Sequence, residues 1–151
     1  MLTELRNGCH RALLRWLYPP LCRWQRFSGR RSRVALVAVW FQGRLLVVRH
    51  SYRPGTSLPG GVSGRRETGL ETALRELEEE VGIAAEPDAL IQTGRSDGHW
   101  TIFEYRPKSE PSVRIDNREI AAAAFVDPDL ITDPTQSLAR YLWRARRRHA
   151  A

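Results

Sequence analysis

Cysteine is scarce in this chain: Cys9 and Cys22 are the only two among 151 residues, and they form no CxxC pair. A structural zinc site or a disulfide framework needs several cysteines at short, regular spacings. Neither is therefore expected to organise the fold. Two thiols without such spacing favour a reducing compartment, so the expected location is the cytoplasm.

Long hydrophobic runs are also missing. The longest apolar stretches, around residues 34–41 and 45–48, are far shorter than the roughly 20 residues of a membrane-spanning helix. The chain has no internal repeat and no low-complexity tract, and its length suits one domain. We expect a basic N-terminal helix and connection over residues 1–33, followed by a single domain over residues 34–151.

Lysine is nearly absent, since Lys108 is the only lysine among 24 basic residues. A GC-rich, bacterial coding sequence produces such an arginine excess without a functional reason. The distribution is more informative: residues 1–33 hold eight arginines and one acid, and residues 140–151 hold five arginines and no acid. The acidic middle thus lies between two basic ends, a charge pattern that suits contact with anionic partners.

The spacing of apolar residues along the chain predicts where the helices and strands lie. Apolar residues recur with helical spacing over residues 2–18, and Pro19 and Pro20 end that helix. Further helices are predicted from near residue 68 and over residues 137–147, with a loop at residues 52–61. Strands are predicted at residues 34–41, 45–50, 90–93, 101–105 and 121–126. Strands on both sides of a central helix, with a second helix at the end, predict an α/β layered sandwich with a mixed sheet.

The stretch GGVSGRRETGLETALRELEEEVGI, residues 60–83, contains four glutamates in five positions. On a helical wheel Glu76, Glu79 and Glu80 fall within an arc of roughly 100° beside an apolar stripe, while Glu78 falls opposite. Like charges at this spacing repel each other, and Arg75 offsets only part of the repulsion. A solvated charged face is one interpretation. A Mg²⁺ site is the other, because this ion prefers carboxylate oxygens, water and phosphate.

The spacing of the same stretch resembles the signature of the Nudix hydrolases. Every defined position of that signature is matched, by Gly61, Glu67, Arg75, Glu76, Leu77, Glu79, Glu80, Gly82 and Ile83. The resemblance extends over about residues 34–147 and leaves the N-terminal helix outside. The chain departs from common family members at residues 64–66, which read Gly-Arg-Arg before the first glutamate of the signature.

The resemblance implies a Nudix-like α/β/α sandwich and Mg²⁺-dependent hydrolysis of a phosphoanhydride, with Mn²⁺ as an alternative metal. The substrate would be a small nucleotide, a nucleoside diphosphate linked to another group. Glu76, Glu79 and Glu80 would hold the metal. Arg75 would orient these acids, and Glu67 would fix the loop, for which a pairing with Arg75 is one route. Gly60 and Gly61 would let the backbone approach metal or phosphate closely.

The general base stays open between Glu79, Glu76 and Glu119, with Glu104 as a further downstream candidate. Other chemistries find little support, because the chain has neither a GxSxG elbow nor a GxxxxGK phosphate loop. His50 and His99 are interpreted as packing or surface residues. Tyr52 and Trp100 are interpreted as structural aromatics, although either could stack on a nucleobase.

A second hypothesis comes from a different class of protein. In it, the Nudix-like core is a binding module with little hydrolase activity. Its peripheral membrane contact would be made through residues 2–18, or nucleic acid would be bound by the basic ends. The nucleotide substrate and the oligomeric state stay open at this stage.

Overall fold

The computed structural model describes residues 33–96, 99–115 and 118–149. The helix predicted over residues 2–18 lies outside these ranges. The described residues contain two α-helices, α2 (Gly69–Val81) and α3 (Gln136–His149), and two short 3₁₀ turns, η1 (Pro87–Ala89) and η2 (Pro128–Leu130). The strands are β1 (Val34–Phe41), β2 (Arg44–His50), β3 (Thr56–Ser57), β4 (Gly60–Val62), β5 (Leu90–Ser96), β6 (Trp100–Tyr105) and β7 (Ile120–Val126).

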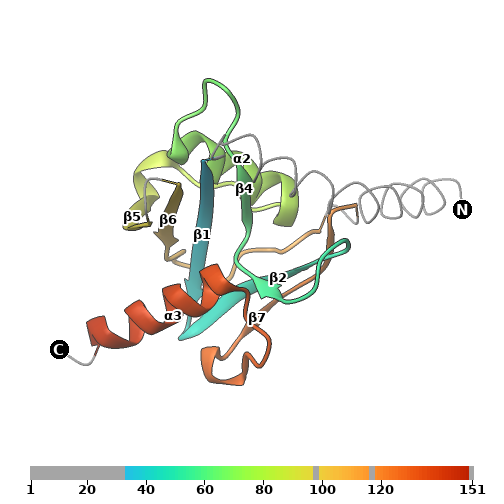
Figure 1. The fold of residues 1–151 in the computed structure, drawn as a ribbon, viewed down its shortest axis with the longest axis vertical. Helices are drawn as coiled ribbons and strands as arrows, with labels where there is room; N and C mark the ends of the chain where they lie inside the picture. The colour runs from blue at the N-terminus through green and yellow to red at the C-terminus, as the bar shows by residue number, and fades with distance from the viewer. Residues whose placement is uncertain (1–32, 97–98, 116–117, 150–151) are drawn as a thin grey trace, which may run out of the picture.

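Strand β1 is the centre of the sheet (Figure 1). It runs parallel to β6 along one edge, and along the other edge it pairs antiparallel with β4 at its start and with β2 at its end. Strand β2 in turn carries β3 and β7, both antiparallel, while β5 pairs antiparallel with β6. The predicted mixed sheet is therefore confirmed.

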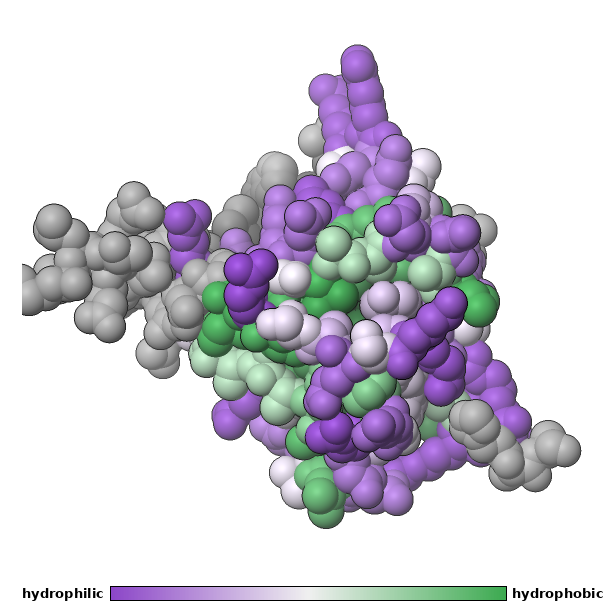
Figure 2. Space-filling view, turned by 180° about the vertical axis from the view of Figure 1, so that it is seen from behind, coloured by the Kyte–Doolittle hydropathy of each residue, from purple (hydrophilic) through white to green (hydrophobic). Residues whose placement is uncertain are grey.

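Successive side chains of β1 point to opposite faces of the sheet, so they belong to two separate layers of the core. Ala35, Val37 and Val39 pack on the α2 side of the sheet, whereas Leu36 and Ala38 pack on the α3 side. Helix α2 thus covers one face of the sheet and α3 covers the other, which confirms the α/β/α sandwich. From behind, hydrophilic side chains cover most of the surface and apolar ones form a band across the middle (Figure 2).

Helix α2 begins and ends where its sequence provides caps. The side chain of Thr68 accepts from the Glu71 amide, and the Glu71 carboxylate accepts from the Thr68 amide, which makes a capping box. Gly82 ends the helix in the left-handed conformation, which glycine adopts without a steric penalty. Ala73, Leu77 and Val81 are fully buried, and so they fix which face of α2 meets the sheet.

The prediction of a loop over residues 52–61 was wrong in its second half. Residues Thr56–Ser57 form β3, and β4 begins at Gly60. Gly60 and Gly61 pair with Leu36 and Ala35 through their backbones, so no side-chain pattern reveals this strand. Strand β5 also extends three residues beyond the predicted end, to Ser96.

No helix within the described ranges is both long and apolar enough to cross a membrane.

Candidate active site

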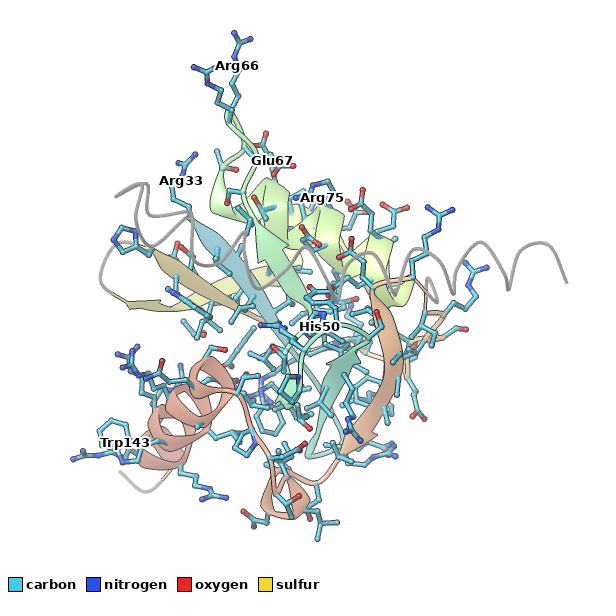
Figure 3. The ribbon with its side chains drawn as sticks, turned by 45° about the vertical axis from the view of Figure 1, so that its right-hand side comes forward. Arg33, His50, Arg66, Glu67, Arg75 and Trp143 are labelled. Atoms are coloured by element: carbon cyan, nitrogen blue, oxygen red, sulfur yellow. The ribbon has the colours of Figure 1, made fainter. Side chains whose placement is uncertain are left out.

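The polar signature residues lie where α2 faces β4, and Figure 3 shows Glu67 and Arg75 there. Arg75 makes most of the hydrogen bonds among these side chains. Its guanidinium donates to both carboxylate oxygens of Glu67, at 2.7 and 3.1 Å, and also to Glu76 at 2.8 Å and Glu79 at 2.9 Å. One cation thus holds three acids in place and offsets part of their mutual repulsion.

Glu67 fixes the loop between β4 and α2. Besides its two bonds from Arg75, its carboxylate accepts from the Gly64 amide at 2.7 Å and from the Thr72 hydroxyl at 3.2 Å. The Arg75 guanidinium and then the Gly64 amide lower the pKa of Glu67 to about 2. Glu67 is therefore ionised, and it points into the protein's own scaffold instead of toward a ligand. Arg66, the residue before it, projects outward at the tip of the loop (Figure 3).

Glu80 is a buried acid with one strong backbone partner. It is 5% exposed, and its Oε2 accepts from the Gly60 amide at 2.8 Å. Burial is the main cause that raises its pKa to about 8, and the nearby carboxylates of Glu76 and Glu119 act in the same direction. A buried carboxylate beside other carboxylates is the environment that a bound cation stabilises.

Glu76 lies under the β4 backbone. A Cβ atom on Gly61 would lie 2.4 Å from Glu76 Oε1, so a larger residue there would displace the Glu76 carboxylate. Burial raises the pKa of Glu76, while the bond from Arg75 opposes this shift. Gly60 is required for a different reason. Its φ is 139°, and a Cβ there would lie 2.2 Å from the carbonyl oxygen of Ala35. The close approach of this glycine pair is therefore to the protein itself.

The three acids expected to hold metal share this region but differ in exposure. The side chain of Glu79 is 62% exposed, that of Glu76 is 14% exposed, and that of Glu80 is 6% exposed. Within the described part of the chain, no three Asp, Glu, His or Cys side chains already converge as a group that could hold a metal ion. Hydrogen bonds explain this, because the Arg75 guanidinium holds the carboxylates of Glu76 and Glu79, and the Gly60 amide holds that of Glu80. The donors are all carboxylate oxygens, which fit a hard divalent cation, and Glu79 is the most exposed of the three.

Glu119 and Glu104, the two downstream candidates for the general base, lie in different parts of the structure, and only Glu119 is near the other acids of the site. Glu119 lies at the start of β7, beside the end of β2, and its charge raises the pKa of both Glu76 and Glu80. It therefore belongs to the acidic group. The prediction of Glu104 as a further candidate for the general base was wrong. This residue lies on the α3 side of the sheet, where its carboxylate accepts from Tyr141 at 2.8 Å and from Arg148 at 2.6 Å.

The end of β2 and the loop after it add two residues that the sequence interpretation did not assign to the site. His50 is 6% exposed, and its Nδ1 lies 4.0 Å from Glu80 Oε1. Arg53 reaches the other ring nitrogen of His50 at 2.6 Å, and its charge also acts on Glu80. Tyr52 packs beside the His50 ring, with centroids 5.3 Å apart. A possible signal was their position directly after a buried strand, where loops carry functional side chains.

Residues 29–146 match the sequence model of the NUDIX domain. This chain belongs to the Nudix hydrolase family. A curated relative, the "MutT-like protein" of Streptomyces ambofaciens, is 32% identical over 101 residues, which cover 66% of each chain. The match thus spans just under two thirds of that relative's length.

Solved structures of the family share the fold. The MutT Nudix hydrolase of Burkholderia pseudomallei is similar with a TM-score of 0.57 and 22% identity, over 73% of this chain and 94% of that one. A bifunctional NMN adenylyltransferase and ADP-ribose pyrophosphatase of Francisella tularensis, solved with AMP and a manganese ion, has a TM-score of 0.53 and 17% identity. That match covers 77% of this chain and 40% of the other. At these identities the likeness establishes the fold of a Nudix hydrolase.

Proposed function

We propose that this Nudix hydrolase cleaves a phosphoanhydride bond in a nucleoside diphosphate linked to another group, and that the reaction depends on Mg²⁺ or Mn²⁺. The observation that carries the proposal is that the buried Glu80 and the largely buried Glu76 lie close to each other and to Glu119, beside the exposed Glu79. Such a concentration of carboxylates has no structural benefit by itself, because burial and neighbouring negative charge both oppose ionisation of Glu76 and Glu80. It favours a divalent cation and a phosphate-bearing substrate.

In this proposal Glu76, Glu79 and Glu80 hold the cation. When bound, a divalent cation neutralises phosphate charge and makes water a better nucleophile. Water adds to phosphorus, the anhydride P–O bond breaks, and two phosphate products leave. Glu79, Glu76 and Glu119 are the candidates to accept the proton of the attacking water. Arg75 positions Glu76 and Glu79, and Glu67 positions Arg75.

The loop after β2 fits the substrate side of this reaction. Arg53 brings a second guanidinium close to Glu80, and Tyr52 lies next to it in the chain. An arginine suits a phosphate group because its planar fork forms two parallel hydrogen bonds. The Francisella tularensis neighbour, solved with a mononucleotide and manganese, supports a nucleotide and a divalent metal as the ligands to test first.

The test compares Glu79→Gln with Glu78→Gln. Both residues are exposed glutamates of α2, but Glu78 lies on the side away from the acidic group, so it is a matched control for charge and helix position. Nucleoside triphosphates, dinucleotides and nucleotide sugars are incubated with Mg²⁺ or Mn²⁺, and released phosphate and pyrophosphate are measured.

We expect Glu79→Gln to lower kcat by at least roughly 100-fold and Glu78→Gln to leave it unchanged. A chelator should abolish turnover by both the natural chain and the control. Full activity of Glu79→Gln on the substrate that the natural chain cleaves would refute the assignment of that residue. Activity that persists in the chelator would refute the metal dependence.

A further inference from the structure

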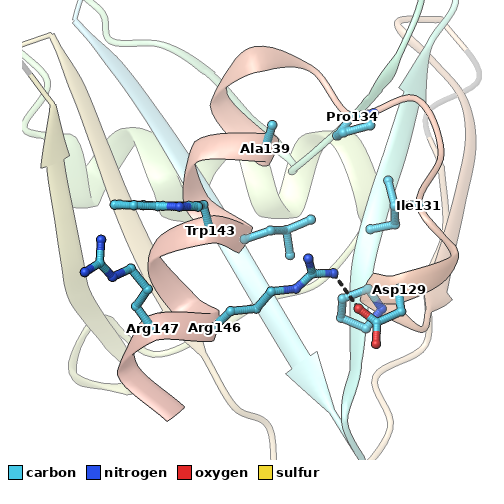
Figure 4. A pocket seen from close by; sticks show the side chains of 9 residues that line it. Asp129, Ile131, Pro134, Ala139, Trp143, Arg146 and Arg147 are labelled. Atoms are coloured by element: carbon cyan, nitrogen blue, oxygen red, sulfur yellow. Dashed lines mark hydrogen bonds and ion pairs between the residues drawn. The ribbon is translucent and has the colours of Figure 1, made fainter. Parts of the chain in front are cut away.

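The exposed face of α3 carries a row of basic side chains around one tryptophan. Arg140, Trp143, Arg144 and Arg147 are all exposed, and their spacing of three, four and seven residues places them on one side of the helix. We call these four residues the α3 stripe. In Figures 3 and 4, Trp143 projects outward from this side of α3.

The arginines of the α3 stripe differ from their neighbours in having no acidic partner among the described residues. Arg146 is paired with Asp129, and Arg148 is paired with Glu104. For the three stripe arginines, residues 33–96, 99–115 and 118–149 provide no ion pair. The helix itself contains no acid. A rigid helix thus presents three uncompensated positive charges within about two turns, or roughly 10 Å.

Trp143 is an exposed aromatic among these charges. It is 59% exposed, and the guanidinium of Arg147 lies 4.7 Å from its ring centroid. Such stacking holds the ring in place while much of its surface stays in water. Beside the ring is a hollow of about 430 Å³ between α3 and η2 (Figure 4), whose apolar lining includes Ile131, Pro134 and Ala139. This volume is within the range of small-molecule sites and has room for one nucleoside.

We propose that the α3 stripe binds single-stranded nucleic acid, with the three arginines on successive phosphates and one base stacked on Trp143. Arginine forks match phosphate geometry, and exposed aromatic rings stack on the bases of unpaired strands. Duplexes keep their bases inside the helix, so a lone stacking platform favours an unpaired strand.

An anionic membrane is the competing occupant, and the packing of α3 argues against it. A helix that lies on a membrane must insert an apolar face. The apolar residues of α3 are already buried against the sheet, among them Leu138, Tyr141 and Leu142. Trp143 is the one large apolar side chain that the α3 stripe leaves for insertion.

The α3 stripe lies on the opposite side of the sheet from the candidate active site, because α2 and α3 cover different faces. The inference therefore goes beyond the proposed hydrolase and does not depend on it. Replacement of stripe residues should leave nucleotide hydrolysis unchanged, which separates loss of binding from loss of the fold.

The experiment measures anisotropy of fluorescein-labelled single strands of 12 nucleotides, one of RNA and one of DNA, with the full chain at 50 and 200 mM salt. Each phosphate contact contributes about −0.7 to the slope of log affinity against log salt. Replacement of Arg140, Arg144 and Arg147 by glutamate should therefore reduce that slope by about 2. The matched single-charge pair is Arg144→Glu and Lys108→Glu, since Lys108 is exposed and lies on a loop outside the stripe.

A second pair of variants tests whether a base stacks on Trp143. Trp143→Ala should weaken binding at least about five-fold, and Trp143→Phe should retain most of the affinity. Leu130→Ala is the control, because Leu130 is 72% exposed and does not belong to the α3 stripe. Equal binding of RNA and DNA would support recognition through phosphates and bases, and a preference for RNA would support added contacts to the 2′-hydroxyls.

Three results would overturn the proposal. The first is that the natural chain binds neither RNA nor DNA at 50 mM salt, including the case where it binds phosphatidylserine vesicles instead. The second is that Arg144→Glu and Lys108→Glu bind equally well. The third is that Trp143→Ala binds as tightly as Leu130→Ala. Thermal melts of each variant establish that the compared proteins are folded.

Discussion

The two adjacent glycines of β4 allow the fold and the candidate site to be perturbed separately. At Gly61 the atoms nearest to an added Cβ belong to the Glu76 carboxylate, at 2.4, 2.6 and 2.9 Å. At Gly60 the nearest atoms belong to the backbone of Ala35 and Leu36, at 2.2 and 2.8 Å. An alanine therefore displaces the Glu76 carboxylate at one position and the central strand at the other.

The magnitudes follow from these distances. For ordinary contact, Glu76 Oε1 must move by about 1 Å in Gly61→Ala, and a misplacement of this size can lower kcat by about 100-fold. The backbone of Gly61 is not in a positive-φ region, so stability should stay within about 1 kcal/mol of the natural chain. Gly60→Ala strains a residue at φ 139° and clashes with backbone, which should cost about 3 kcal/mol or more.

Thermal melts and steady-state turnover measure the two quantities. We expect Gly61→Ala to keep its Tm and lose activity, and Gly60→Ala to lose roughly 10 °C or more in Tm. Unchanged kcat in Gly61→Ala would show that the position of the Glu76 carboxylate is not critical. A greater loss of stability in Gly61→Ala than in Gly60→Ala would refute the reasoning from both contacts.

Three further predictions concern the scaffold around the site. Leu77→Ala should destabilise the protein by about 2 to 5 kcal/mol in urea titrations, because this side chain is fully buried, whereas the exposed Leu130→Ala should change stability by less than about 0.5 kcal/mol. Thr68→Ala removes the side-chain cap of α2 and should cost about 1 kcal/mol by the same assay, while Thr68→Ser should restore most of it. Glu67 has a pKa lowered to about 2 from a usual value near 4.5, so its contribution to stability is fully present above pH 4.5 and is lost as the pH falls toward 2. The stability difference between the natural chain and Glu67→Gln should therefore shrink over that interval in denaturation curves, and a difference independent of pH would contradict the assigned cause.

The sequence predicted those parts of the molecule that depend on side-chain pattern. The strand over residues 34–41 was placed with its observed bounds, because it is an apolar run that is buried on both faces. The grouping of Glu76, Glu79 and Glu80 on one side of a helix also follows from helical spacing alone. The pairing of Glu67 with Arg75 was suggested by the family resemblance, and the structure contains it.

Other features depend on contacts between distant segments, and the pattern does not contain them. Strand β4 is held by backbone bonds of two glycines to β1. The positions of Glu104 and Glu119 relative to the acidic group depend on which face of the sheet each strand presents, and alternation within short strands did not determine that face. His50 was interpreted as a packing residue because a lone histidine has no spacing that indicates a partner. Its proximity to Glu80 arises from the pairing of β2 within the sheet.

The acids of the candidate site each have a partner within the protein. Arg75 bonds to Glu67, Glu76 and Glu79, while Glu80 accepts from the Gly60 amide and has a raised pKa. If Glu76 and Glu79 hold a cation as proposed, that cation would compete with Arg75 for them, and the exposed Glu79 would leave its bond with the least rearrangement. Arg75→Lys, which cannot form the forked contacts, should therefore alter Mg²⁺ affinity in titrations more than it alters Tm.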